Sequence, residues 1–242
     1  MENYEPGMSF GEDTAEIYDD ELRGDEEAAV SFLERLAGGG PALELAIGTG
    51  RIALPLAARG IRVDGIDISP PMVAKLREKP GGDQIPVTMG DFAEVPVSGD
   101  YRLIYVVYNT FNNLLTQDDQ VRCFESVAAH LTGDGSFLVE AEVPNFLYRV
   151  YDDQYVHAES ISVDEVRFDV GRHDPVAQRH DETHVRLTNE SVRLFPIVQR
   201  YTWPSELDLM ARIAGLRLRE RWDGWNREPF TSTGNVVSVY GR

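Results

Sequence analysis

The chain has 242 residues, enough to bury one sizeable core, and carries a formal net charge of −18 at pH 7. This charge argues against a nucleic acid or an anionic membrane as partner, because both require clustered Lys and Arg. No apolar run reaches the ~18 residues of a transmembrane helix, the acidic N-terminus is unlike a secretory signal, and the lone Cys123 excludes an intramolecular disulfide. We therefore expect a cytoplasmic protein with a single domain over residues 1–242.

The first 40 residues predict an N-terminal helical cap. Residues 1–10 are expected to be mobile, and residues 11–23 to form an acidic helix. Asp25 is a candidate N-cap for a second helix, whose apolar face comprises Ala29, Val30, Phe32, Leu33 and Leu36. The Gly-Gly-Gly-Pro run at 38–41 ends this helix, so we assign residues 1–40 to the cap.

Strand-like and helix-like segments alternate in the next hundred residues. Pro70 and Pro71 suit the first turn of one of these helices. This alternation indicates a doubly wound, mostly parallel sheet with helices on both faces. The expected order is strand 42–46, helix 51–59, strand 61–66, helix 70–79, strand 85–89, strand 102–107, helix 117–131 and strand 135–141.

The pattern changes after residue 142. Polar and apolar residues alternate over 166–170, 176–187 and 192–202, with short turns between them, which predicts an antiparallel meander. Helix 204–214 and strands 216–222 and 235–241 then return to the main sheet. The predicted fold class is α/β, a Rossmann-like doubly wound sheet with an antiparallel β insertion after the fifth strand. We interpret residues 143–203 as this inserted lid.

A glycine-rich turn follows the first predicted strand. The chain runs through Leu43 and Leu45, turns at Gly48 and Gly50, and enters a helix. Glycine at such a turn lets the backbone approach a ligand closely. Glu44 lies inside the strand, where a carboxylate would repel a pyrophosphate. The turn therefore favours a ligand with a cationic amino-acid tail.

Two further acids follow predicted strands. Asp67 comes at the end of the strand 61–66, where a carboxylate can accept hydrogen bonds from a ribose diol. Asp91 follows the strand 85–89 and can accept from an adenine amino group, while Phe92 can pack on the ring. The three turns together describe a ligand with an amino acid, a ribose and an adenine but no phosphate.

Residues 44–50, 65–69 and 90–92 resemble the first three motifs of the class I S-adenosylmethionine-dependent methyltransferases, with Ala46 in place of the first glycine. The resemblance spans roughly 41–140 and implies S-adenosylmethionine as cofactor and S-adenosylhomocysteine as product. A rival interpretation is an NAD(P)-dependent oxidoreductase, because Gly48, Gly50 and Ala53 also fit Gly-x-Gly-x-x-Ala. A second rival interpretation is a non-catalytic protein that binds S-adenosylmethionine. The cofactor-binding residues that the resemblance implies are Tyr18, Glu44, Ala46, Gly48, Thr49, Gly50, Asp67, Ile68, Met72, Asp91, Phe92 and Tyr108.

The run after the fourth predicted strand is the candidate acceptor site. Asn109, Thr110 and Phe111 resemble the Asn-Ser-Phe of glycine and sarcosine N-methyltransferases, where the asparagine faces the acceptor. Tyr18 and Asp19 resemble a Tyr-Asp pair that closes over the cofactor in small-molecule N-methyltransferases. We therefore expect Tyr18 and Asn109 to organise the transfer. The predicted substrate residues are Asn109, Phe111, Asn112, Asn113 and Phe146.

Fewer residues of the sequence indicate which kind of acceptor is methylated. His157 is the best-placed candidate for the general base that O-methylation usually needs, and no other histidine stands out. The acidic surface suits an amine, so we expect N-methylation of a specialised metabolite such as an aminosugar or an amino-acid derivative. O-methylation is the alternative. His173, His180 and His184 are interpreted as a surface feature, no metal site is expected, and the lid is expected to set substrate choice or to form a homo-oligomer contact.

Overall fold

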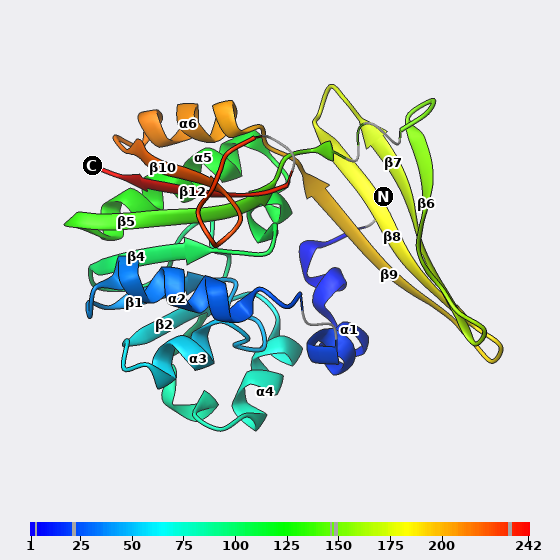
Figure 1. Cartoon of the computed structure of the whole chain (residues 1–242), viewed down its shortest axis with the longest axis horizontal. Helices are drawn as coiled ribbons and strands as arrows, with labels where there is room; N and C mark the ends of the chain where they lie inside the picture. Colours follow the sequence, from blue (N-terminus) through cyan, green and yellow to red (C-terminus); the bar gives the residue numbers. More distant parts are fainter. Residues whose placement is uncertain (3, 21–22, 146, 148–149, 232–233) are drawn as a thin grey trace.

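The computed structural model describes residues 1–2, 4–20, 23–145, 147, 150–231 and 234–242. Its main body is an eight-stranded sheet in the order β11-β10-β12-β5-β4-β1-β2-β3, with helices packed on both faces (Figure 1). β1 to β5 run parallel, whereas β10 to β12 pair antiparallel with one another and with β5. The strands are β1 (Ala42–Leu45), β2 (Val63–Asp67), β3 (Val87–Met89), β4 (Tyr101–Val106), β5 (Leu131–Glu142), β10 (Arg217–Asp223), β11 (Glu228–Pro229) and β12 (Asn235–Gly241).

The order of the strands places a ligand site. β1 is buried along its whole length and lies between β2 and β4, so the winding of the sheet reverses beside it. Open α/β sheets bind ligands at the carboxyl end of the strands at such a reversal. The predicted Rossmann-like, mostly parallel fold is thus confirmed, and the glycine-rich turn after β1 stands at this point.

Five helices complete the main body, and two aromatic groups fill the space beneath them. Phe124 packs edge-on against Phe111, Phe137 and Tyr240 on one face of the sheet, and Phe32 packs edge-on against Trp225 on the other. The helices are α2 (Glu26–Ala37), α3 (Ala53–Ala58), α4 (Pro70–Glu78), α5 (Gln117–His130) and α6 (Pro204–Ile213). No helix among the described residues is long and apolar enough to cross a membrane.

The helix N-termini differ in how they are capped. Ser69 caps α4 by accepting from the Met72 N–H at 3.2 Å, and Thr116 caps α5. The expected cap of α2 by Asp25 is wrong, because the Asp25 side chain makes no capping hydrogen bond. Glu26 instead folds back and accepts from the backbone N–H groups of Arg23 and Gly24 at 2.9 and 3.0 Å.

The N-terminal segment is ordered against a second sheet. It forms η1 (Pro6–Phe10), α1 (Glu12–Ile17) and η2 (Tyr18–Asp20) and lies between the main body and that sheet (Figure 1). Ser9 Oγ donates to the Pro196 carbonyl at 2.7 Å and is bonded to the Tyr4 hydroxyl at 2.6 Å. Within the stretch 1–10, which was expected to be mobile, residues 6–10 instead form η1, which packs on β9.

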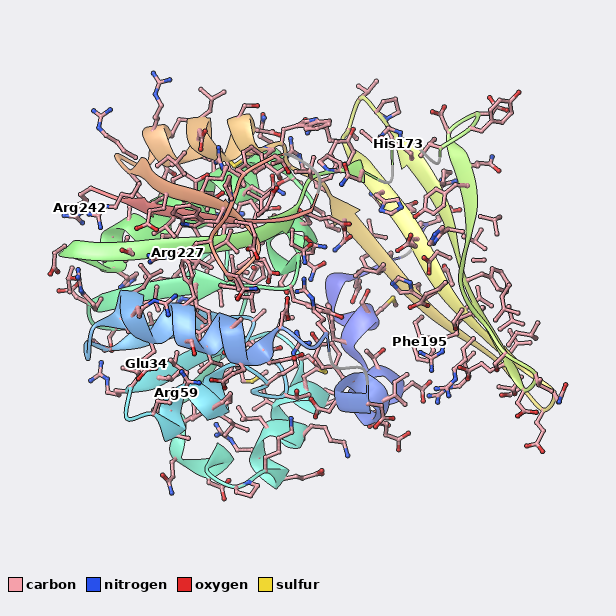
Figure 2. All side chains as sticks on the ribbon, viewed as in Figure 1. Glu34, Arg59, His173, Phe195, Arg227 and Arg242 are labelled. Atoms are coloured by element: carbon pink, nitrogen blue, oxygen red, sulfur yellow. The ribbon has the colours of Figure 1, made fainter. Side chains whose placement is uncertain are left out.

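The second sheet has four antiparallel strands in the order β6-β7-β8-β9. They are β6 (Gln154–Ile161), β7 (Glu165–Asp174), β8 (Arg179–Thr188) and β9 (Val192–Arg200). The sequence predicted an antiparallel meander here but not β6, whose residues are mostly exposed and show no apolar alternation. Phe195 lies on the side of this sheet that faces the N-terminal segment (Figure 2).

Candidate functional site

The turn after β1 is built from residues with positive φ. Ala46, Gly48 and Gly50 have φ angles of 57°, 55° and 77°. A Cβ atom added at Gly50 would lie 2.4 Å from Leu76 Cδ1, so this position accepts only glycine without a shift of its neighbours. The turn brings the backbone close to α4 and leaves its outer side open to a ligand.

Asp67 ties this turn to the end of β2. One carboxylate oxygen accepts from the Gly48 N–H at 2.6 Å and the other from the Ser69 N–H at 2.7 Å. Burial raises the pKa of Asp67 above its ordinary value, although these two N–H donors oppose the rise. Each oxygen keeps a further lone pair, so the carboxylate can still accept from a ligand.

An inner cavity of about 280 Å³ opens at the carboxyl ends of β1, β2 and β3. It has both apolar and acidic walls, and its carboxylates are those of Asp67, Asp91 and Asp119. Eight of the predicted cofactor residues line it. Its lining comprises Phe10, Tyr18, Ala46, Gly48, Asp67, Ile68, Met72, Asp91, Phe92, Thr110, Asn113, Leu114, Leu115 and Asp119.

An outer cavity of about 530 Å³ lies between the N-terminal segment, the loop 108–113 and one face of the second sheet. It shares four lining residues with the inner cavity: Phe10, Tyr18, Thr110 and Asn113. A ligand in one cavity can therefore meet a ligand in the other beside Tyr18. This arrangement suits a reaction between two bound molecules.

Glu44 lies beneath the site and lines neither cavity. It is 3% exposed and accepts a hydrogen bond from the Tyr105 hydroxyl at 3.0 Å. Burial raises the pKa of Glu44 to about 8, opposed by Tyr105 and by the nearby Arg51. Thr49 is buried as well and donates to Asp19 at 2.7 Å. Both residues support the turn from within.

Replacement of Glu44 by glutamine is expected to flatten the dependence of stability on pH. Burial raises the pKa of wild-type Glu44 to about 8, so the folded protein keeps this proton up to about pH 8, whereas the unfolded chain loses it near the ordinary pKa of 4.5. The free energy of unfolding of the wild type should therefore fall as the pH rises from about 4.5 to about 8, by up to about 1.4 kcal/mol per pH unit. Urea unfolding at several pH values measures this slope. Glu125→Gln, an exposed change on α5, is the control, and equal slopes in wild type and Glu44→Gln would contradict the assignment.

Tyr18 stands where the two cavities meet. Its ring lies edge-on to Tyr108 at 6.4 Å, and the Arg51 guanidinium lies 5.8 Å from its centre. Burial raises the pKa of Tyr18 to about 12, so its hydroxyl keeps its proton at neutral pH. Tyr108 lines the outer cavity rather than the inner one, between the guanidinium groups of Arg23 and Arg51 at 4.5 and 4.2 Å.

The loop after β4 presents three asparagines to the outer cavity. Asn109 has a φ of 59° and uses both ends of its amide on Glu142, accepting from its N–H at 2.5 Å and donating to its carboxylate at 3.2 Å. Asn112 is 5% exposed, and its Oδ1 has no hydrogen-bond partner within the described part of the chain. Asn113 reaches both cavities.

Two predicted substrate residues need separate comment. The expectation for Phe111 is wrong, because its side chain is fully buried against Phe124 in the core and lines neither cavity. Its apolar bulk is used to anchor the loop. Phe146 lies outside the described residues.

The second sheet contributes histidines that the sequence analysis placed on the surface. His180 and His184 both line the outer cavity, whereas His157 lines neither cavity. Ligand atoms of Asp169, Glu182 and His184 lie within 4.8 Å of one another. Because β8 pairs with β7 in register, Asp169 meets Glu182 and His184 although they lie 13 and 15 residues further along the chain. Sequence alone gave no signal for this pairing.

Comparison with known proteins identifies the kind of enzyme. A family model described as a methyltransferase domain matches residues 42–135. The CcbJ methyltransferase from Streptomyces caelestis is 33% identical, with a TM-score of 0.91 over 98% of this chain and 99% of that one. CalS10 from Micromonospora echinaspora, an amino pentose methyltransferase solved with bound S-adenosylmethionine, has a TM-score of 0.67 and 21% identity over 99% of both chains.

A curated relative agrees with these structures. The cypemycin N-terminal methyltransferase of a Streptomyces species is 26% identical over 206 residues, 81% of this chain and 80% of the relative. The chain belongs to the class I S-adenosylmethionine-dependent methyltransferases. It is thus an enzyme whose cofactor is S-adenosylmethionine.

The inner cavity fits this cofactor in its chemistry. Carboxylate acceptors, Asp67 and Asp91, stand at the ends of β2 and β3, and the apolar side chains of Ile68, Met72 and Phe92 lie beside them. A ribose diol and an adenine amino group are hydrogen-bond donors, and an adenine ring needs an apolar wall. The backbone of the Gly48 turn also lines this cavity, where glycine allows a ligand to approach closely.

Proposed function

We propose that the protein is a cytoplasmic enzyme that methylates the nitrogen of a small-molecule amine of specialised metabolism, such as an aminosugar or an amino-acid derivative. The observation that carries the proposal is the pair of cavities that share Tyr18 as a wall. The relative described as an N-terminal methyltransferase supports nitrogen as the accepting atom, and the structure described as an amino pentose methyltransferase supports an acceptor that carries an amine.

We assign the inner cavity to the cofactor. Asp67 holds the ribose, Asp91 the adenine amino group, and Ile68, Met72 and Phe92 the faces of the adenine. Ala46 and Gly48 lie against the amino-acid end. Glu44, Thr49 and Gly50 act from beneath by holding the turn, which differs from the direct contact that the sequence analysis expected.

The outer cavity is assigned to the acceptor. S-adenosylmethionine supplies a methyl group on a sulfonium, and this group is transferred in line to a lone pair held roughly 3 to 3.5 Å away. Tyr18 excludes water at the junction and orients the reacting groups through its hydroxyl. Asn109 is a positioning residue, because its bonds to Glu142 hold the loop on the end of β5. Asn112 and Asn113 face the acceptor.

The first experiment is calorimetric titration with S-adenosylhomocysteine, with NAD and NADP as controls. Micromolar binding of the first and none of the nicotinamides is expected. A screen of amines with labelled S-adenosylmethionine then tests methyl transfer. Transfer to alcohols but not to amines would contradict N-methylation.

O-methylation is the second candidate, because His180 lines the acceptor cavity. Its Nε2 lies 2.5 Å from the Tyr155 hydroxyl, and burial lowers the pKa of His180 to about 4. A neutral imidazole is the form that a general base requires. Loss of activity toward alcohols in His180→Gln, with activity toward amines retained, would support this candidate.

Replacement of Tyr18 by phenylalanine is expected to reduce kcat by about tenfold while changing the Kd of S-adenosylhomocysteine less than threefold. The ring and its packing on Tyr108 stay, and only the hydroxyl is lost. One hydrogen bond to a reacting group is worth roughly 1 kcal/mol or more. Tyr4→Phe is the control, since Tyr4 lines neither cavity and its hydroxyl bonds Ser9. An unchanged kcat in Tyr18→Phe would leave Tyr18 with packing alone.

A further inference from the structure

The wall of the outer cavity that the second sheet provides contains two sheltered carboxylates. Glu182 and Asp169 have side chains 14% and 16% exposed, and both line the cavity. They stand on β8 and β7 and belong to the acceptor side, since neither lines the inner cavity. Sheltered carboxylates in a cavity need a compensating positive charge or hydrogen-bond donors.

The partners of these carboxylates are titratable side chains. Asp169 accepts from His184 Nδ1 at 2.7 Å and lies 3.5 Å from His157, and Glu182 lies 3.6 Å from both His180 and His184. Tyr155 also donates to Glu182. Within the described part of the chain, neither carboxylate is paired with an arginine or a lysine. One half-exposed imidazole, that of His184, is shared by two acids.

Arginines on the same sheet face do not supply the missing charge. Arg167 Nε donates to Glu165 at 2.6 Å, and Arg186 also contacts Glu165. In register, Arg167 stands opposite Arg186, two residues along the strands from the pair Asp169 and His184. Both arginines therefore contact Glu165, on the same strand as Asp169.

A glycine on β7 makes room for the Tyr155 side chain beside Glu182. Gly171 stands opposite Tyr155 in register, and a Cβ at Gly171 would lie 2.2 Å from the Tyr155 ring. Only glycine lets this ring lie across the strand and bring its hydroxyl to Glu182. The Tyr155 hydroxyl thus holds Glu182 in the cavity wall, which both residues line.

A second, independent observation is a polar side chain in another wall of this cavity that the described residues leave without a partner. Asn112 lies in the wall from the loop after β4 and is more than nine-tenths buried, yet its Oδ1 has no partner among the described residues. A buried carbonyl oxygen without a donor costs about 1–3 kcal/mol. A bound molecule with N–H or O–H groups would remove that cost.

We propose that Glu182 and Asp169 form an anchoring subsite for a second, cationic group of the acceptor, separate from the nitrogen that is methylated. The subsite deepens the proposed N-methylation and rests on it for the reacting nitrogen. The reacting group lies at the junction beside Tyr18, and the cationic group lies against the second sheet. An acceptor with two amino groups, or with an amine and another fixed cation, can place one group beside Tyr18 and the other against Glu182 and Asp169.

Matched probes test the subsite by binding. The protein saturated with S-adenosylhomocysteine is titrated calorimetrically with short α,ω-diamines and with amino alcohols of equal chain length. In wild type, at least one diamine is expected to bind about tenfold more tightly than its amino alcohol. Glu182→Gln, which keeps the shape but loses the charge, should abolish this preference. Glu190→Gln, in the exposed turn after β8, should keep it.

Unchanged affinity for S-adenosylhomocysteine in both variants shows that they fold. The proposal is overturned if no diamine binds more tightly than its amino alcohol, or if Glu182→Gln retains the preference. A stoichiometric divalent cation present in wild type and absent from Glu182→Gln would also overturn it, since the three side chains would then be metal ligands. A diamine preference without methylation of any amine would defeat the proposed function and leave the subsite standing.

Discussion

Replacement of Asp67 by alanine is expected to weaken the binding of S-adenosylhomocysteine by about 100-fold or more. Two losses add. The proposed hydrogen bonds from the ribose disappear, and the N–H groups of Gly48 and Ser69 lose the acceptors that lie 2.6 and 2.7 Å away. Hydrogen bonds to a charged group contribute about 1.5–3 kcal/mol, and a 100-fold change in Kd corresponds to about 2.7 kcal/mol.

The geometry makes this effect larger than that of a ligand contact alone. Because the carboxylate fixes the Gly48 N–H, the turn after β1 should relax when it is removed. Calorimetry with S-adenosylhomocysteine measures the effect. Asp64→Asn is the matched control, since Asp64 lies on the same strand, lines neither cavity and accepts from the Tyr101 hydroxyl at 2.9 Å. A Kd for Asp67→Ala within threefold of wild type would remove Asp67 from the cofactor site.

The sequence was most informative where local rules decide the structure. Glycines after a buried strand, and acids at the ends of the next two strands, place Gly48, Asp67 and Asp91 in one cavity because parallel strands share their carboxyl edge. Ser69 and Pro70 likewise mark the start of α4 by the ordinary rules of helix capping. Each of these inferences needs only a few neighbouring residues.

Such local rules could not predict contacts between segments that are distant in the sequence. Phe111 follows a strand like a pocket residue, yet it fills the space above Phe124 in the core. Glu44 occupies the motif position expected of a ligand contact, but its burial under Arg51 and Tyr105 depends on the packing of β4. The convergence of Asp169 with His184 requires the register of β7 on β8, which neither strand encodes alone.

The attachment of the second sheet to the main body depends on a buried polar group. Arg200, at the end of β9, is 5% exposed and pairs with Glu206 of α6 at 2.7 Å. It also donates to Gln120 of α5, and the Gln120 amide donates back to the Arg200 carbonyl at 3.0 Å. Burial would raise the pKa of Glu206, but Arg200 and two glutamines hold it below the ordinary value.

Replacement of Arg200 by methionine is therefore expected to lower the free energy of unfolding by about 3–5 kcal/mol, because the Glu206 carboxylate, 15% exposed, loses its charged partner and the buried Gln120 loses one donor. Urea unfolding measures it. Arg193→Met is the control, since Arg193 lies on the same strand but pairs with an exposed Asp13 at 3.8 Å, and such a surface pair is worth about 0–1 kcal/mol. Equal losses in the two variants would show that the Arg200 group does not hold the sheet. Diamine binding to Arg200→Met is then measured at a temperature where the variant is folded. Weaker binding there, together with the larger loss of stability, would show that Arg200 at the end of β9 also positions the wall of the outer cavity that the second sheet forms.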